Sequence, residues 1–134
     1  MPIDIDETRR PIIHVTFVGD PSDAEVDRFL VAMRAHILAR KQKTVTIYDL
    51  TRIGGTTAAQ RRRQAEWVAE NAESLRATSL GVVFVIRSAV ARGVLTSILW
   101  TQPLPQPHAI VTTLAEADLW AREKLRAAGA PLPP

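Results

Sequence analysis

Hydrophobic and polar positions along the chain follow two periods in turn, a two-residue period typical of strands and a three-to-four-residue period typical of helices. Strands are predicted over 11–18 ("PIIHVTFV"), 44–50 ("TVTIYDL"), 80–86 ("LGVVFVI") and from 108 onward ("HAIVTT"). The segment 80–86 is almost unbroken apolar sequence, typical of a parallel strand buried on both faces, so it is expected at or near the centre of a sheet. The opening "PIDID" is a candidate for an antiparallel edge strand.

Helical spacing of apolar residues fills the segments between these strands. Three helices are expected to begin at capping boxes, in which Ser or Thr is followed three residues later by Glu or Gln: Ser22 with Glu25, Thr57 with Gln60 and Thr113 with Glu116. These helices are predicted to run to about Arg40, Ala77 and Ala128, and a further short helix is predicted over 89–100, before the prolines of "TQPLPQP". The core-facing stripe of the second helix is expected to contain Ala58, Ala65, Val68, Ala72 and Leu75, with Trp67 one step beside it.

Strands that alternate with helices four times predict an α/β fold. The expected architecture is a mixed, mainly parallel sheet of four to five strands with four helices packed on it. At 134 residues the chain has the size of one domain and is long enough to bury a core without disulfides. We therefore expect a single domain over 1–134, with an N-terminal edge segment at 1–10 and a frayed tail at 129–134.

Composition narrows the function classes. The 17 Lys and Arg residues and the 14 Asp and Glu residues give a net charge of +3, and the two signs are interleaved, so no basic stripe suited to nucleic acid is expected. The chain has no cysteine, which excludes disulfides, thiolate catalysis and cysteine metal sites. No run approaches the roughly 18 apolar residues of a membrane span, and "MPIDIDETRR" lacks the apolar core of a signal peptide. These features predict a cytoplasmic protein without a nucleic-acid partner or a membrane span.

Catalytic and metal-binding patterns are weak. His14, His36 and His108 fall on separate predicted elements without a neighbouring acidic cluster, so neither a metal nor another cofactor is expected. Serine occurs without the Gly-x-Ser-x-Gly context of an activated nucleophile. Asp49, at the end of a predicted strand, could act as a general base, but such a residue more often caps the following turn. An enzyme is therefore the less favoured class.

Three segments carry a resemblance to a known family. "VTIYDLTRI", "GVVFVI" and "AEADLWAREKL" resemble a hydrophobic strand ending in Asp-Leu-Ser/Thr, the next strand and the closing helix of the STAS domains of bacterial anti-sigma-factor antagonists, the SpoIIAA-like proteins. The order of elements over 11–128 is similar too. The resemblance implies a STAS/SpoIIAA-like topology and a regulatory module that binds a protein partner, such as a kinase or an anti-sigma-like factor.

The same resemblance points to a site of modification. In phosphorylatable members an Asp-Ser-Ser-Gly turn follows the strand, and a partner kinase phosphorylates its serine. The corresponding turn here reads "GGTTAAQ", so the resemblance makes Thr56 and Thr57 the candidate phospho-acceptors. The sequence departs from the family pattern in two places, because the preceding Asp is absent and Ala58 stands where the glycine would follow.

Candidate binding residues gather where the predicted strands end. The carboxyl ends of parallel strands share one edge of a sheet, where helix N-termini and loops bind ligands. The residues expected there, as an anion-binding or partner-binding site, are Arg52, Gly54, Gly55, Arg61, Arg62, Arg63, Arg87 and Arg92. The positive end of the helix dipole makes arginines in the first turn unfavourable unless an anion lies close enough to neutralise them. That anion could belong to a ligand or a partner; alternatively Glu66 pairs with Arg62 or Arg63, and the two glycines only form a turn.

The helix predicted over 89–100 is apolar on nearly every side. Successive helical residues are rotated by about 100°, so Leu95, Ile98, Leu99 and Trp100 cannot all face one sheet. The "PLPQP" segment, a second copy or another protein, or lipid could cover the remainder. Because "PLPQP" offers only Leu104 as apolar cover, a homodimer is expected, with these four residues as its candidate interface.

The sequence thus predicts a non-enzymatic regulatory or protein-interaction module. The alternative is a small-molecule binding domain that holds an anionic ligand or a lipid at the carboxyl edge of the sheet. A protein-binding module needs exposed apolar surface beside the junction at 52–57, whereas a ligand site needs a concave pocket there.

Overall fold

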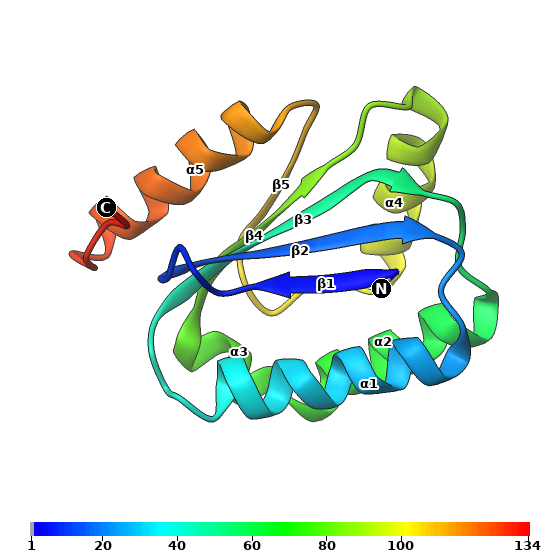
Figure 1. Cartoon of the computed structure of the whole chain (residues 1–134), viewed down its shortest axis with the longest axis horizontal. Coiled ribbons are helices and arrows are strands. Elements are labelled where there is room, and N and C mark those ends of the chain that lie inside the picture. Colours follow the sequence, from blue (N-terminus) through cyan, green and yellow to red (C-terminus); the bar gives the residue numbers. More distant parts are fainter. Residues whose placement is uncertain (1) are drawn as a thin grey trace.

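Five strands form one sheet in the computed structural model, which describes residues 2–134 (Figure 1). In sheet order they are β1 (Ile3–Asp6), β2 (Ile12–Gly19), β3 (Thr44–Ile53), β4 (Ser79–Val85) and β5 (His108–Val111). β1 pairs with β2 antiparallel, and the other neighbours are parallel. The predicted mixed, mainly parallel sheet is confirmed, and so is the N-terminal edge strand; Met1 of the predicted segment 1–10 lies outside the described residues.

The parallel strands have the same order in the sheet as in the chain, and this order determines where the helices lie. Crossovers between parallel strands are almost always right-handed, so successive crossovers in one direction pass over the same face. The crossover helices are α1 (Asp23–Met33), α2 (Ala58–Glu70), α3 (Ala72–Thr78) and α4 (Ala89–Thr101), and α5 (Leu114–Ala127) follows the last strand. In Figure 1, α1, α2 and α3 lie on one side of the sheet and α5 lies on the other.

Alternate residues of each strand supply two cores. On the α1 side, Val15 and Phe17 of β2 pack with Phe29 of α1, and the half-buried Trp67 of α2 packs against this cluster. The side chain of Trp67 is therefore part of the helix-side core, although it was predicted one step off the inner stripe. On the α5 side, a second cluster joins β2, β3 and β4 to α5: Ile12, Val45, Ile47, Val83, Val85, Ala117, Ala121 and Leu125.

The α5 face of the sheet is covered only in part. α5 packs mainly over β3 and β4. On β2 this face begins with Ile12, which is buried beside α5; the other residues of the face on β1 and β2, Asp4, Asp6, His14 and Thr16, are not fully buried. The polar members of the alternating β2 sequence therefore mark the half of the sheet that no helix covers.

The helix predicted from Thr57 to about Ala77 is divided into two, which gives five α-helices within residues 2–134 instead of the predicted four. The break lies at Asn71, whose backbone has φ −109° and ψ 16° and whose Nδ2 donates to the Trp67 carbonyl at 2.8 Å. An Asn side chain that bonds the backbone competes with continued helix. The predicted core-facing position of Ala58 is also wrong, because Ala58 is exposed and Gln60 is the buried residue of this turn.

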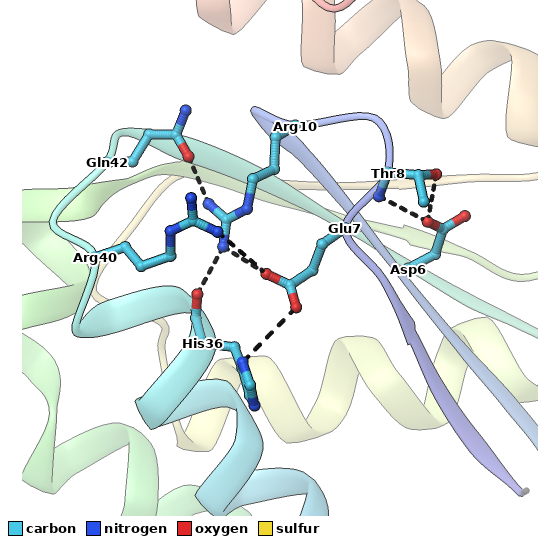
Figure 2. A network of polar contacts seen from close by, with 7 residues as sticks. All are labelled: Asp6, Glu7, Thr8, Arg10, His36, Arg40 and Gln42. Atoms are coloured by element: carbon cyan, nitrogen blue, oxygen red, sulfur yellow. Dashed lines mark hydrogen bonds and ion pairs between the residues drawn. The ribbon is translucent and has the colours of Figure 1, made fainter.

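A polar network joins the β1–β2 turn to the end of the first helix (Figure 2). Arg10 donates to Glu7 Oε1 and to the His36 carbonyl, both at 2.6 Å, and it also donates to Gln42. His36 belongs to a π-helical turn, Arg34–Leu38, that continues α1 toward the predicted end near residue 40. The guanidinium of Arg10 thus ties the edge hairpin to the segment that leads into β3.

Candidate functional site

The carboxyl ends of the parallel strands lie at one edge of the sheet, and β3 extends further into this edge than predicted. It ends at Ile53, not near residue 50. Asp49 Oδ1 accepts hydrogen bonds from the Thr51 backbone N–H at 3.0 Å and from the Thr51 hydroxyl at 2.7 Å. The register between β2 and β3 shifts at this point, between the pairs Thr16–Asp49 and Val18–Arg52. Asp49 thus bonds the backbone two residues ahead, as the predicted cap would, but it does so inside β3 and not at a turn.

Gly54 and Gly55 form an exposed loop between β3 and α2, and Asp20 lies over this loop. The backbone N–H of Gly54 donates to the Gly19 carbonyl at 2.8 Å. A Cβ on Gly54 would overlap the Asp20 carboxylate, so the close approach of Asp20 requires glycine at this position. The sequence made this loop a candidate site for an anionic ligand. In the structure the Asp20 carboxylate occupies the space beside the loop.

Thr57 is the N-cap of α2, and the predicted capping box is present. The Thr57 hydroxyl accepts from the Gln60 backbone N–H, and Gln60 Oε1 accepts from the Thr57 backbone N–H, each at 3.0 Å. Gln60 Nε2 also donates to the Pro21 carbonyl and to Asp23 Oδ1, both at 2.9 Å. Gln60 thus joins the start of α2 to the start of α1. The sequence predicted only the local capping box of Thr57 and Gln60. The contacts of Gln60 with Pro21 and Asp23 are long-range, so no local pattern reveals them.

The arginines in the first turns of α2 have different partners. Arg61 Nη1 donates to the Thr56 carbonyl at 2.6 Å and contacts the Thr56 hydroxyl at 3.3 Å. Arg63 Nε pairs with Asp27 Oδ1 of α1 at 3.1 Å. The predicted pairing with Glu66 is wrong for both Arg62 and Arg63, since Glu66 takes part in no ion pair within residues 2–134.

Four of the candidate arginines are exposed and have no side-chain hydrogen bond or ion pair within the described part of the chain: Arg52, Arg62, Arg87 and Arg92. Arg52 is the last residue but one of β3, Arg62 lies in the second turn of α2, and Arg87 lies between β4 and α4. Since β3 and β4 are neighbours in the sheet, these side chains belong to adjacent connections at the same edge. The structure therefore places these arginines in connections at the same edge of the sheet, without a partner in residues 2–134.

α4 begins at this edge and is the least covered helix. None of its residues is buried, and Val90, Val94 and Trp100 are 79%, 54% and 85% exposed. Of the predicted interface residues, only Trp100 is fully exposed; Leu95, Ile98 and Leu99 are half-buried. The chain therefore does not cover α4 completely by itself. No helix within residues 2–134 combines the length and apolar character that crossing a bilayer requires.

Neither of the two best-formed cavities is lined by the candidate arginines or by the glycine loop. One of about 270 Å³ lies between β1 and α1, and one of about 190 Å³ opens on the uncovered half of the sheet. The topology explains this. Open α/β sheets form ligand crevices where neighbouring crossovers leave to opposite faces. Here the parallel strands follow one another in sequential order, so no such point of reversal exists between β2 and β5.

The smaller cavity is polar, and its lining residues are Asp4, Asp6, Arg9, His14, Thr16, Asp49 and Leu114. Burial lowers the pKa of His14 below its ordinary value of 6.5, with a smaller contribution from Arg9 in the same direction. His14 Nδ1 is buried and has no hydrogen-bond partner within residues 2–134. In that part of the chain no group of three or more His, Cys, Asp or Glu side chains is placed to hold a metal ion. Polar side chains are also what an uncovered sheet face ordinarily carries.

Comparison with known proteins relates the chain to others by structure alone. No protein-family profile and no curated protein sequence matches it. An uncharacterised DUF3478-family protein from Shewanella loihica PV-4, described as having a SpoIIAA-like fold, superposes with a TM-score of 0.68 at 12% identity over 89% of this chain and 91% of the other.

Two anti-sigma factor antagonists are also similar. SpoIIAA in its unphosphorylated form matches with a TM-score of 0.62 at 14% identity, over 90% of this chain and 97% of its own. An antagonist from Mycobacterium paratuberculosis matches with a TM-score of 0.56 at 18% identity, over 90% and 92% of the two chains. The chain has the α/β fold of SpoIIAA-like, STAS-type domains.

Proposed function

We propose that this chain is a non-enzymatic regulatory module, of the anti-sigma-factor-antagonist kind, that binds a protein partner at the strand-end edge in the bacterial cytoplasm. Two of the similar structures are named as anti-sigma factor antagonists, which act on another protein. Fold alone does not specify function, so the proposal depends on the edge itself.

The observation that carries the proposal is an edge with free cations and exposed apolar surface, neither of which lines the two best-formed cavities. Arg52, Arg62 and Arg87 are exposed there without partners in the described residues. Val90, in the first turn of α4, is 79% exposed beside them. Arginine is enriched in protein interfaces, and its planar guanidinium pairs well with carboxylates of a partner. A surface of this kind fits an acidic patch on another protein.

The alternative, an anionic small molecule or a lipid held at the same edge, has less support. Such a ligand needs a concave site with converging donors. The Asp20 carboxylate lies against the glycine loop, and neither that loop nor the candidate arginines line the two best-formed cavities. Repulsion from Asp20 opposes the approach of a phosphate or carboxylate to the backbone of Gly54.

Affinity capture from the native host, with variants that reverse charge, tests the proposal. The edge variant combines Arg52→Glu, Arg62→Glu and Arg87→Glu. The matched control combines Arg34→Glu, Arg76→Glu and Arg126→Glu, three exposed arginines on helices that end at the opposite edge. Both variants change the net charge equally, and neither removes an ion pair in the described residues.

We expect one protein to be retained by the wild-type chain and by the control but lost with the edge variant. Equal retention by all three chains, or no specific protein in any of them, would contradict the proposed site.

A further inference from the structure

The residues of α4 divide into two faces. With about 100° of rotation per residue, an arc of about 120° contains Val90, Gly93, Val94, Ser97, Trp100 and Thr101. All six are exposed, and we call them the outward face of α4. The half-buried residues, Ala91, Leu95, Ile98 and Leu99, lie on the opposite side of the helix. The structure therefore turns three of the four predicted interface residues inward and leaves Trp100, Val90 and Val94 outward.

Gly93, at the middle of this helix, is not required by packing within residues 2–134. A Cβ placed on it meets no atom within 4 Å, so no internal close approach requires glycine. Glycine in a helix interior lowers helix stability relative to alanine. Gly93 lies within the outward face, between Val90, Val94 and Trp100. A glycine with bulky apolar neighbours is explained if another helix packs closely against this face.

We propose that the outward face of α4 pairs with the same face of a second copy of this chain. In an antiparallel pair with a two-fold axis near residue 95, Gly93 of one copy lies opposite Ser97 of the other. Val90 then lies opposite Trp100 at both ends of the contact. Small residues meet at the centre, where the backbones are closest, and large apolar residues meet outside it. Two-fold contacts of this isologous kind are the commonest in soluble oligomers.

Charge favours a second copy over a partner of opposite charge on this face. None of the six outward residues is charged, and Arg92 lies outside the arc. A partner selected by charge would be expected to face arginines, as at the strand-end edge, whereas an uncharged face of alternating small and bulky residues is complementary to itself. The antiparallel arrangement also places the two helix dipoles in opposite directions.

The size of the contact predicts a weak dimer. α4 has 13 residues, so its outward face is about 20 Å long and about 10 Å wide. Stable complexes bury about 800 Å² on each partner, several times the area of such a strip. We therefore expect association that depends on concentration in the micromolar range or above.

Sedimentation equilibrium of the full chain, from about 10 μM to about 1 mM, tests this pairing. We expect the average mass to rise from 14.8 kDa toward twice that value. Gly93→Gln is expected to keep the chain at 14.8 kDa throughout, because the new side chain has open space in the monomer but blocks the close approach. Trp100→Gln is expected to do the same. Val31→Gln, which changes a 69% exposed valine on α1, is the control and should associate like wild type.

A mass of 14.8 kDa at all concentrations, or a dimer that Gly93→Gln leaves intact, would overturn the proposal. Flotation with vesicles of phosphatidylcholine and phosphatidylglycerol is measured alongside. Vesicle binding by a monomeric chain that Trp100→Gln abolishes would also overturn it, because the occupant of the face would then be a bilayer surface. Gly93 and Trp100 are not changed in the edge variant, so failure here leaves the proposed protein-binding function to its own test.

Discussion

Trp120 of α5 lies directly on Gly81 of β4. A Cβ added to Gly81 would approach Trp120 Cη2 to 2.5 Å and Cζ3 to 2.9 Å. The Lys124 ammonium lies 5.2 Å from the centre of the Trp120 ring, where a cation–π contact is favourable. The absence of a side chain at position 81 therefore lets the last helix pack closely on the sheet.

Gly81→Ala is expected to destabilise the fold by about 1–3 kcal/mol, because the indole ring must move out of its packed position. Gly93→Ala is the matched control. Its Cβ meets nothing within 4 Å, so at low concentration it should be neutral or stabilising by up to about 1 kcal/mol. Urea unfolding followed by circular dichroism measures both. Equal stability of the two variants would show that the contact between Trp120 and Gly81 is unimportant.

Gln60→Ala should cost about 1–3 kcal/mol of folding free energy, because it leaves the Pro21 carbonyl and the Thr57 N–H without their partner. Glu66→Ala, on the exposed face of the same helix, is the control and is expected to stay within about 0.5 kcal/mol of wild type. Chemical denaturation of the two variants measures whether the hydrogen bonds of Gln60 to Pro21 and Asp23 stabilise the fold beyond the local helix cap. A loss no greater than that of Glu66→Ala would argue against such stabilisation.

His14 should make stability fall as the pH drops below 6.5. Burial lowers its pKa in the folded chain, so the unfolded chain takes up the proton first. The loss therefore begins as the pH falls through the ordinary value of 6.5 and ends once the pH is below the lower folded pKa. Asp6, Asp118 and Asp49 oppose the shift but do not cancel it.

Urea midpoints measured between about pH 8 and pH 5 for wild type and His14→Gln test this effect, and the variant should show the weaker dependence. The pKa of Asp6 is lowered by hydrogen bonds from Thr8, so its stabilising contribution is lost only at pH values below 3.8 and does not interfere. Identical slopes for wild type and variant would exclude His14 as the source.

Phosphorylation, if it regulates this chain, is expected at Thr57 or Thr56. Thr57 is exposed at the N-terminus of α2, and Arg61 already contacts Thr56. A phosphate at this position is favoured by the helix dipole and by the neighbouring arginines. Mass spectrometry of the chain from its native host, across growth conditions, should find the modification within 56–57. Phosphate found only at other positions would remove these threonines as the switch.

Most of the fold was predictable because its signals are local. Alternation or an apolar run predicted four strands and made "PIDID" a candidate for the fifth. Each predicted cap, Ser22, Thr57 and Thr113, accepts a hydrogen bond from the residue three positions later. The break at Asn71 was not visible, since apolar spacing continues through it to Leu75. Gln60 was missed as a core residue because a hydrophobic pattern contains no signal for a buried amide that is satisfied by another helix.

The candidate site was predictable in its location but not in its pairing. Sequential parallel strands place Arg52, Arg62 and Arg87 at one edge, and the order of elements sufficed to predict that. Helical spacing suggested Glu66 as the partner of Arg63, but the ion pair is made with Asp27, because α1 and α2 lie side by side only in the folded chain. The absence of a topological reversal between β2 and β5 depends on strand order across the whole sheet, which local sequence patterns do not reveal.

Native mass spectrometry of the chain isolated gently from its own cells tests the central proposal most directly, because it separates a protein partner from a bound small molecule. We expect the 14.8 kDa chain in a complex with one other polypeptide. That complex should be absent from the edge variant, in which Arg52, Arg62 and Arg87 are replaced by glutamate. It should be present in the control, in which Arg34, Arg76 and Arg126 are replaced by glutamate. A chain that carries only a small anionic molecule or a lipid, lost with the same edge variant, would contradict the account and identify the edge as a ligand site.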